Sequence, residues 1–542
     1  MATDMNSDAT RDMTDDTNRW MTTLPRAVRR AATDFAGIEA VVDGDVRITY
    51  AELGARIQHA QRALMASGIA PGDPVAIWAP NIWEWIVASM AITCAGGVLV
   101  PLNTRYKGAE AAYILSKSRA RLLFTVDGFL GNDYVGAVNE LRAELPALEE
   151  VVTLRGNAPA GSASWTDFLA RAERVSEAEA EARADAVAPD AVADILFTSG
   201  TTGRPKGAMV THGQDVRQYT EYSARVGFAP GARYLMVNPY FHSFGYKAGI
   251  ISSILSGMTM VPLMVFELDA MMAAIEREQI SVLPGPPTIY QSMLDHPTRR
   301  DYDLSSLALA ITGAAVVPVE MIKRMRAELT FSTVITAYGL TEATGTATTC
   351  LPDDDPEIIA HSAGRAIDGV DLRIVDLDGN VLPPNEPGEI LIRGYGVMLG
   401  YLDDPEETAR AIDADGWLHT GDVGRLDDAG NLTITDRMKD MFIVGGFNAY
   451  PAEIENALLE RRELSQVAVV GVPDERMGEV GAAFVVLRAG ATVDVDELLT
   501  WAKGRMANFK VPQRIEVVDA LPVNAAGKVA KVELREWATK PR

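Results

Sequence analysis

The chain has 542 residues, of which 48% are hydrophobic, and its formal net charge at pH 7 is −24. This length and apolar content can support a large core divided into several subdomains. The acidic balance argues against nucleic-acid binding, which needs a basic face for phosphate contacts, so any anionic cofactor must be met by local cations. Six histidines and two cysteines leave no metal-ligand cluster and no disulfide framework, and we expect a reducing cytoplasm.

The N-terminal part shows no membrane or export signal. Residues 1–21 are expected to form a disordered leader, because residues 1–18 are polar and acid-rich without an apolar stretch. The longest uncharged run, residues 86–102, contains two adjacent glycines and is slightly short for a membrane span. We therefore predict a buried helix over 83–94, a turn, and a strand over 98–101. No integral membrane segment is expected, while peripheral membrane contact stays open.

From residue 190 onward, short apolar runs typical of strands alternate with helical patterns at the spacing of βαβ units. This alternation predicts a layered α/β core with parallel strands and ligands at their carboxyl ends. The expected strands are 234–237, 258–263, 281–283, 307–312 and 333–337. The expected helices are 249–255, 270–278, 287–294 and 318–329, and an alanine-rich, charged helix over 176–188 precedes this core.

The pattern changes again after residue 370. Strands at 371–375 and 389–393 around a Pro-rich turn predict a small β subdomain at about 370–436. Farther on, helices at 451–459 and 495–506 and strands at 467–470, 482–487 and 514–518 predict an independent α+β lid. We therefore expect an N-terminal domain over 22–438 and a mobile lid domain over 439–542.

The segment from Thr198 to Gly207 contains three glycines, four hydroxyl side chains and two cations. It lies between expected strands at 194–197 and 208–210. Glycines allow close backbone approach, and hydroxyl and amide groups donate to anionic oxygens, so the segment predicts a phosphate-holding loop. It differs from the common phosphate loop, which has a lysine directly after its second glycine. Taken alone, a solvated turn explains the segment more simply.

Five motifs occur in order along the chain, at residues 198–207, 338–342, 419–422, 435–440 and 524–528. Together they resemble the adenylate-forming superfamily of acyl-CoA synthetases, luciferases and peptide-synthetase adenylation domains, over nearly the whole chain. The resemblance implies that ATP and a carboxylic acid give an acyl-adenylate and pyrophosphate, and that coenzyme A then displaces AMP. Mg²⁺ is the implied metal. Because two anions must meet in the first step, charge neutralisation and orientation are expected to supply most of the catalysis.

The same resemblance implies the residues that hold the phosphates and the metal. The loop would grip the β- and γ-phosphates, using Thr198, Ser199, Gly200, Thr201, Thr202, Gly203 and Lys206. Glu342 would organise Mg²⁺ together with Thr198, since this hard ion suits one or two carboxylates plus phosphate oxygens. Thr341 would touch the α-phosphate. A carboxylate at a helix N-terminus is the structural alternative for Glu342.

Adenine and ribose contacts are implied in the same way. Tyr338 would stack on adenine beside Gly339, with the backbone of Gly313 and Ala314 opposite. Asp422 and Arg437 would bind the ribose hydroxyls. Without the ordered motifs, Tyr338 could be an ordinary core residue and Asp422 part of a turn.

Residues of the expected lid would serve both half-reactions. Lys528 would reach the substrate carboxylate and the α-phosphate, where negative charge accumulates, whereas an exposed lysine near a C-terminus is ordinarily solvated. Lys439 matches the hinge position at which the lid would swing between the half-reactions. Gly445 and Gly446 would let the pantetheine arm pass, with a strand bulge as the alternative.

The acyl pocket is expected in two stretches. The first contributes His242, Ser243, Tyr246 and Lys247, and the second, rich in proline, contributes Gly285 and Pro286. A core histidine is the structural alternative for His242. Lys247 could lie on the surface or recognise a polar group of the acid.

These stretches look similar to actinobacterial ligases of steroid breakdown, which activate a bicyclic methyl-hydroindanone propanoate. A medium-chain or aryl-alkanoate CoA ligase is the runner-up. An acyl-AMP ligase loading a carrier protein and a non-catalytic nucleotide-binding regulator are rival classes. A homo-oligomer is left open.

Overall fold

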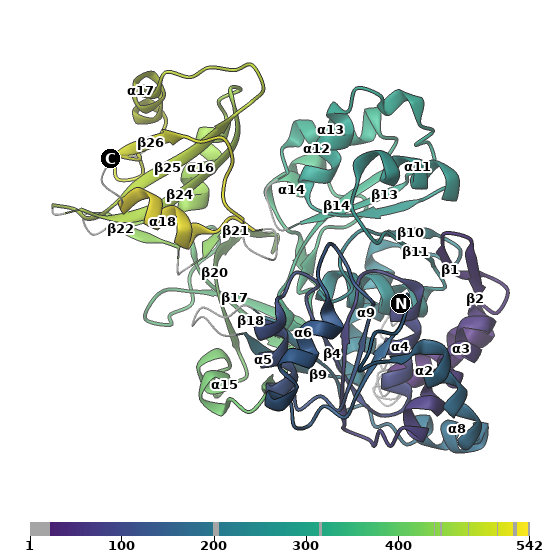
Figure 1. Cartoon of the computed structure of the whole chain (residues 1–542). Coiled ribbons are helices and arrows are strands. Elements are labelled where there is room, and N and C mark those ends of the chain that lie inside the picture. Colours follow the sequence, from purple (N-terminus) through teal and green to yellow (C-terminus); the bar gives the residue numbers. More distant parts are fainter. Residues whose placement is uncertain are drawn as a thin grey trace, which may run out of the picture. The chain divides into compact units, whose positions relative to one another are not determined.

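The computed structural model describes residues 22–198, 205–313, 317–437, 440–444, 447–474, 476–506, 508–523 and 528–539. The expected leader at 1–21 lies outside this part. The chain forms two compact units (Figure 1). Unit 1 consists of Met1–Asp371 and Ile392–Leu418, and unit 2 of Leu372–Leu391 and His419–Arg542.

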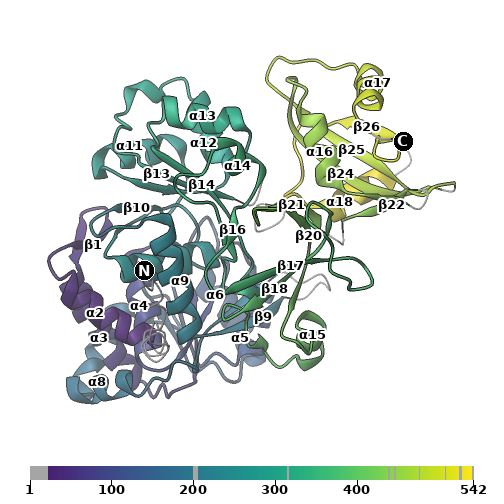
Figure 2. The same cartoon turned by 180° about the vertical axis from the view of Figure 1, so that it is seen from behind.

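Unit 1 contains a nine-stranded sheet with the order β16-β15-β14-β13-β12-β10-β11-β1-β2. Its central strands run parallel, as predicted, and are β10 (Arg233–Met236), β11 (Thr259–Pro262), β12 (Val282–Pro284), β13 (Leu309–Gly313) and β14 (Thr333–Tyr338). The other strands are β1 (Glu39–Asp43), β2 (Val46–Thr49), β15 (Thr348–Thr349) and β16 (Arg365–Ala366), and β16 and β2 form the two edges of the sheet. The helices that follow these strands are α11 (Leu268–Glu278), α12 (Pro287–Asp295), α13 (Val319–Glu328) and α14 (Pro356–His361). Helices α12 and α13 lie beside β13 and β14 in both views of the chain (Figure 1 and Figure 2).

An eight-stranded sheet completes unit 1, with the order β19-β9-β8-β4-β3-β5-β6-β7. Its strands are β3 (Pro74–Trp78), β4 (Val98–Pro101), β5 (Leu122–Thr125), β6 (Glu150–Thr153), β7 (Ala163–Ser164), β8 (Val192–Thr198), β9 (Lys206–Thr211) and β19 (Gly400–Tyr401). The remaining α-helices of the unit are α2 (Leu24–Asp34), α3 (Tyr50–Ala66), α4 (Trp83–Cys94), α5 (Gly108–Ser118), α6 (Tyr134–Glu140), α7 (Trp165–Leu169), α8 (Glu177–Asp185), α9 (His212–Val226), α10 (Ser252–Ser256) and α15 (Pro405–Ala411). The predicted α/β class is confirmed.

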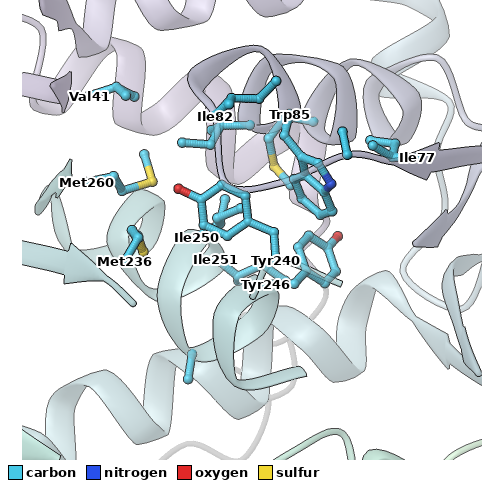
Figure 3. Packing of buried hydrophobic residues seen from close by; sticks show 14 of the residues in the cluster. Val41, Ile77, Ile82, Trp85, Met236, Tyr240, Tyr246, Ile250, Ile251 and Met260 are labelled. Atoms are coloured by element: carbon cyan, nitrogen blue, oxygen red, sulfur yellow. The ribbon is translucent and has the colours of Figure 1, made fainter. Parts of the chain in front are cut away.

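The uncharged run is a buried helix and strand, as predicted, and both elements have the predicted bounds. Trp85 of α4 is fully buried and packs against Tyr240 and Tyr246, with ring centroids 5.2 and 5.8 Å apart (Figure 3). Within the described residues, no helix is both long and apolar enough to cross a membrane. The apolar surface of α4 is therefore covered by the protein's own core.

The predicted helix at 249–255 begins earlier in the structure. A π-helix, η3 (Phe244–Ile251), leads directly into α10. Gly245 allows this start, because a Cβ at that position would lie 2.1 Å from the carbonyl oxygen of Pro239. The aromatic and polar residues before Gly249 obscured the helical pattern in the sequence. Single π-helical turns are frequent at functional sites.

Two further sheets belong wholly or mostly to unit 2. The first has the order β17-β18-β20-β21 and consists of β17 (Val370–Val375), β18 (Gly388–Gly394), β20 (Leu418–Leu426) and β21 (Leu432–Arg437). The second consists of β22 (Phe442–Val444), β23 (Phe447–Ala449), β24 (Leu464–Asp474), β25 (Gly478–Leu487) and β26 (Arg514–Val517), with helices α16 (Pro451–Leu459), α17 (Val495–Arg505) and α18 (Lys531–Thr539). The predicted lid elements are all present. The boundary at 438/439 falls outside the described residues and stays a prediction.

His212, the first residue of α9, makes stability depend on pH. Its ring is 1% exposed, and its Nδ1 has no hydrogen-bond partner within the described residues. Burial lowers its pKa from 6.5 to about 4. The unfolded chain therefore binds a proton at His212 more tightly than the folded protein does. The contribution of neutral His212 to the free energy of unfolding is complete above about pH 6.5 and is lost as the pH drops towards 4.

We expect this group alone to remove about 2 kcal/mol of unfolding free energy between pH 7 and pH 5. The measurement is urea unfolding of wild type and His212→Gln at both pH values. The variant is expected to lose less stability on acidification than wild type. Equal losses in the two proteins would contradict the assignment.

Candidate active site

The expected phosphate loop lies in sequence between two strands that pair with each other. Strands β8 and β9 are antiparallel, with Thr198 opposite Lys206 in register. This pairing confirms the predicted strands on both sides of the loop. The loop residues Ser199, Gly200, Thr201, Thr202 and Gly203 lie outside the described residues.

Thr198 and Glu342 lie together although 144 positions separate them in sequence. Glu342 belongs to η5 (Thr341–Ala343), a 3₁₀ turn that follows β14. The Thr198 hydroxyl donates to Glu342 Oε1 at 3.3 Å, and the Tyr401 hydroxyl donates to the same oxygen at 2.9 Å. Burial and the Glu342 carboxylate raise the pKa of Tyr401. Tyr401 therefore remains a hydroxyl donor that orients Glu342.

Lys206 has a carboxylate partner that the sequence did not reveal. Its ammonium forms an ion pair with Glu407 of α15 and lies 5.2 Å from the centroid of the Tyr401 ring. A hydrogen bond from Lys206 lowers the pKa of Glu407. Thr198, Glu342, Tyr401, Lys206 and Glu407 thus form one polar cluster at the base of the loop.

The residues expected around adenine occupy neighbouring strand ends. Gly313 ends β13 and Tyr338 ends β14, and these strands are parallel with Gly313 opposite Ala337. A Cβ on Gly313 would lie 2.8 Å from the carbonyl oxygen of Ala337, and one on Gly339 would lie 2.2 Å from that of Gly345. Neither position has room for a side chain. Tyr338 is buried, and Ala314 lies outside the described residues.

Of the residues in the first stretch expected to line the acyl pocket, some lie on the surface and others in the core. His242 is exposed, and its Nδ1 accepts a hydrogen bond from the Phe244 amide at 3.2 Å. Ser243 is buried next to Gly345, where an added Cβ would lie 3.2 Å from the Ser243 Cβ. Tyr246 is fully buried in the aromatic core around Trp85 (Figure 3).

The second stretch follows β12. Gly285 is buried, and its amide donates to the Ile311 carbonyl at 2.9 Å, whereas Pro286 is exposed. Gly285 therefore lies at the carboxyl end of the parallel sheet, which is also the edge where Gly313 and Tyr338 lie.

The surface alternative for Lys247 is wrong. Its side chain is fully buried, with Nζ 2.8 Å from Asp215 Oδ1 and 3.0 Å from Asp194 Oδ2. Burial lowers the pKa of Lys247, but the two carboxylates outweigh it and raise the pKa above its usual value. Burial and the Asp215 charge raise the pKa of Asp194. Asp194 interrupts an otherwise apolar strand, and this was the available signal for a buried ion pair.

In unit 2, the expected ribose residues lie on two neighbouring strands. Asp422 of β20 is opposite Arg437 of β21 in register, and the Asp422 side chain is 5% exposed. The preceding Thr420 hydroxyl accepts from the Asp422 amide at 3.1 Å, and His419 Nδ1 lies 2.9 Å from Glu389 Oε2. These contacts fix the backbone that presents Asp422.

Lys528 is exposed and lies one residue before Val529, which bridges to Val523. The turn at 524–527, the expected hinge Lys439, and Gly445 and Gly446 lie outside the described residues. Their roles stay predictions.

Comparison with known proteins identifies the family. Residues 28–402 match the family described as AMP-binding enzyme, and residues 453–528 match its C-terminal domain. The chain belongs to the AMP-binding enzymes. The family predicted from the ordered motifs is thereby confirmed.

Two curated AMP-binding enzymes are each 50% identical to the chain. They come from Rhodococcus jostii and Mycobacterium tuberculosis, and both are named as CoA ligases of a 7a-methyl-1,5-dioxo-octahydroindenyl propanoyl group. Each alignment covers 95% of this chain and 98% of the relative. Among solved AMP-binding enzymes, ATP-bound MatB from Rhodopseudomonas palustris is 31% identical with a TM-score of 0.84, covering 96% of this chain and 99% of that one.

Proposed function

We propose that this AMP-binding enzyme is an ATP-dependent ligase that joins a bicyclic hydroindanone propanoate to coenzyme A. The acid attacks the α-phosphorus of ATP, which gives acyl-AMP and pyrophosphate, and the coenzyme A thiol then displaces AMP. The observation that carries the proposal is 50% identity along almost the full length of two ligases named for that substrate.

The polar cluster of unit 1 suits the first step. One carboxylate, Glu342, with a threonine hydroxyl beside it, is a donor set that Mg²⁺ accepts together with phosphate oxygens. When bound, Mg²⁺ would neutralise phosphate charge. Thr198 and Tyr401 hold Glu342 in one orientation by donating to the same oxygen. Thr341 would contact the α-phosphate from the same turn, and the loop from Ser199 to Gly203 would bind the outer phosphates.

We assign the other ligand contacts from the sequence motifs to which the remaining residues belong. Tyr338 and the backbone at Gly313 would enclose adenine, and Asp422 with Arg437 would bind ribose. Lys528 would stabilise the charge that develops in adenylation, Lys439 would serve as the hinge, and Gly445 and Gly446 would line the path of coenzyme A. We place Ser243 and Gly285 at the acyl site.

A cytoplasmic location fits the two cysteines. Cys94 and Cys350 are buried and free, and burial raises the pKa of Cys94 to about 12. Both thiols suit a reducing environment.

The substrate is tested by measuring AMP release with coenzyme A over a panel of acids. We expect the methyl-dioxo-octahydroindenyl propanoate to give a higher kcat/KM than octanoate or an aryl-alkanoate. Higher values for octanoate would replace the proposed substrate with a medium-chain acid. Formation of acyl-AMP without thioester would indicate a carrier-loading ligase, and no AMP with any acid would indicate a non-catalytic regulator.

A further inference from the structure

A buried charge cluster joins three elements of unit 1. Lys247 of η3, Asp194 of β8 and Asp215 of α9 are all 0% exposed, and the ammonium contacts both carboxylates. We call these three residues the buried triad. Removing charges from water costs several kcal/mol per ion, so such a cluster adds little stability compared with apolar packing. What such a cluster can supply instead is a fixed arrangement of the elements that it joins.

Each of the three elements also contacts the segment that contains Glu342. Strand β8 ends at Thr198, four residues after Asp194, and the Thr198 hydroxyl donates to Glu342. Helix α9 carries Tyr219 one turn after Asp215, and the Tyr219 hydroxyl donates to the Thr344 carbonyl at 2.9 Å. These two contacts hold both ends of the short segment 342–344.

The third contact comes from Ser243, the residue directly before the π-helix. Ser243 lies against Gly345, so closely that a Cβ on Gly345 would be 3.2 Å from the Ser243 Cβ and 2.4 Å from the Tyr219 hydroxyl oxygen. Lys247 is one helical turn after Ser243 and is the single charged residue of η3. Strand β8, helix α9 and the π-helix region are therefore joined at two places. They contact one another at the Lys247 ammonium, and all three contact residues 342–345.

We propose that Lys247 is a positioning residue for adenylation: through Asp194 and Asp215 it holds β8, α9 and η3 in the one arrangement that orients Glu342 and places Ser243 against Gly345. The ammonium contacts protein carboxylates and acts through them. The inference rests on the adenylation chemistry proposed above.

The test compares Lys247→Met with the double variant Lys247→Met/Asp215→Asn. The double variant is needed because Lys247→Met alone leaves two buried carboxyl groups near each other. In Lys247→Met/Asp215→Asn, one carboxyl remains and can bind a proton, so no net charge stays buried. Both are assayed by ATP–pyrophosphate exchange at a temperature where circular dichroism shows the folded state. We expect the rate of exchange to fall by roughly 10- to 100-fold, the loss typical of an ångström-scale misplacement. The KM for coenzyme A, measured separately in thioester formation, is expected to stay unchanged. Lys247→Arg, which keeps the charge, is expected to retain more exchange than Lys247→Met.

Glu278→Gln is the matched control. Glu278 is also a buried carboxylate in unit 1, with three cationic partners: Arg233 at 2.9 Å, Arg47 at 3.0 Å and Arg277 at 3.1 Å. Within the described residues, its side chain accepts hydrogen bonds from these arginines and not from residues 342–345. We expect this variant to lose stability but to keep its exchange rate when folded. Wild-type exchange by folded Lys247→Met/Asp215→Asn, or an equal loss in folded Glu278→Gln, would overturn the proposal. So would failure of the double variant to fold, since that would make the buried triad a stability element. If the wild-type protein itself showed no ATP–pyrophosphate exchange, the proposed function would be refuted instead.

Discussion

Replacing Lys528 by alanine is expected to lower ATP–pyrophosphate exchange by roughly 10²–10³-fold, the loss typical of one preorganised contact to developing charge. In the transition state of adenylation, negative charge accumulates on the reacting carboxylate and the α-phosphate. Lys528 is the cation that we assign to this charge. Its side chain is exposed, so its removal leaves the packing of unit 2 intact.

The control for this variant is Lys503→Ala. Lys503 is also an exposed lysine of unit 2, in the last turn of α17, and we assign it no role in the reaction. We expect it to keep full exchange, and both variants to unfold at the wild-type temperature. Near-normal exchange in Lys528→Ala would refute the assignment.

Much of the fold was predictable because local patterns and tertiary packing agree. The helix of α4 and the strand β4 have the predicted bounds, since a continuous apolar run and a glycine turn define both. The parallel strands β10 to β14 followed from the alternation of apolar runs with amphipathic helices. The π-helix η3 was missed in part, because its start depends on the approach of Gly245 to Pro239, a contact that no periodicity encodes.

Only the site residues that belong to the sequence motifs could be predicted. Thr198 and Glu342 belong to two motifs, and the structure brings them together. Tyr401 and Glu407 belong to neither motif, and their contacts arise because β19 pairs with β9 at the sheet edge. Chain order gave no reason to connect residue 401 with residue 342. The partners of Lys247 were hidden for the same reason, although the charge of Asp194 within an apolar strand marked one of them.

The second large effect is expected for Glu342→Gln. The amide keeps an oxygen that can accept from the Thr198 and Tyr401 hydroxyls, so the geometry of the turn is preserved while the charge is lost. A neutral amide is a much poorer partner for Mg²⁺ than a carboxylate. We expect exchange to fall by roughly 10²–10³-fold, within the range for loss of one electrostatic contact in a catalytic site. The expected defect includes a higher Mg²⁺ concentration for half-maximal exchange.

Tyr401→Phe separates the charge of Glu342 from its orientation. This variant keeps the carboxylate and the Thr198 hydrogen bond but removes the 2.9 Å hydrogen bond from tyrosine. Since a hydrogen bond to a charged group contributes about 1.5–3 kcal/mol, we expect a loss of exchange smaller than in Glu342→Gln and little change in the Mg²⁺ requirement. If Glu342→Gln kept the wild-type Mg²⁺ dependence, the carboxylate would not be organising the metal. Its role would then be to hold the base of the loop through Thr198 and Tyr401, and Glu342→Gln, which keeps the accepting oxygen, would lose no more exchange than Tyr401→Phe.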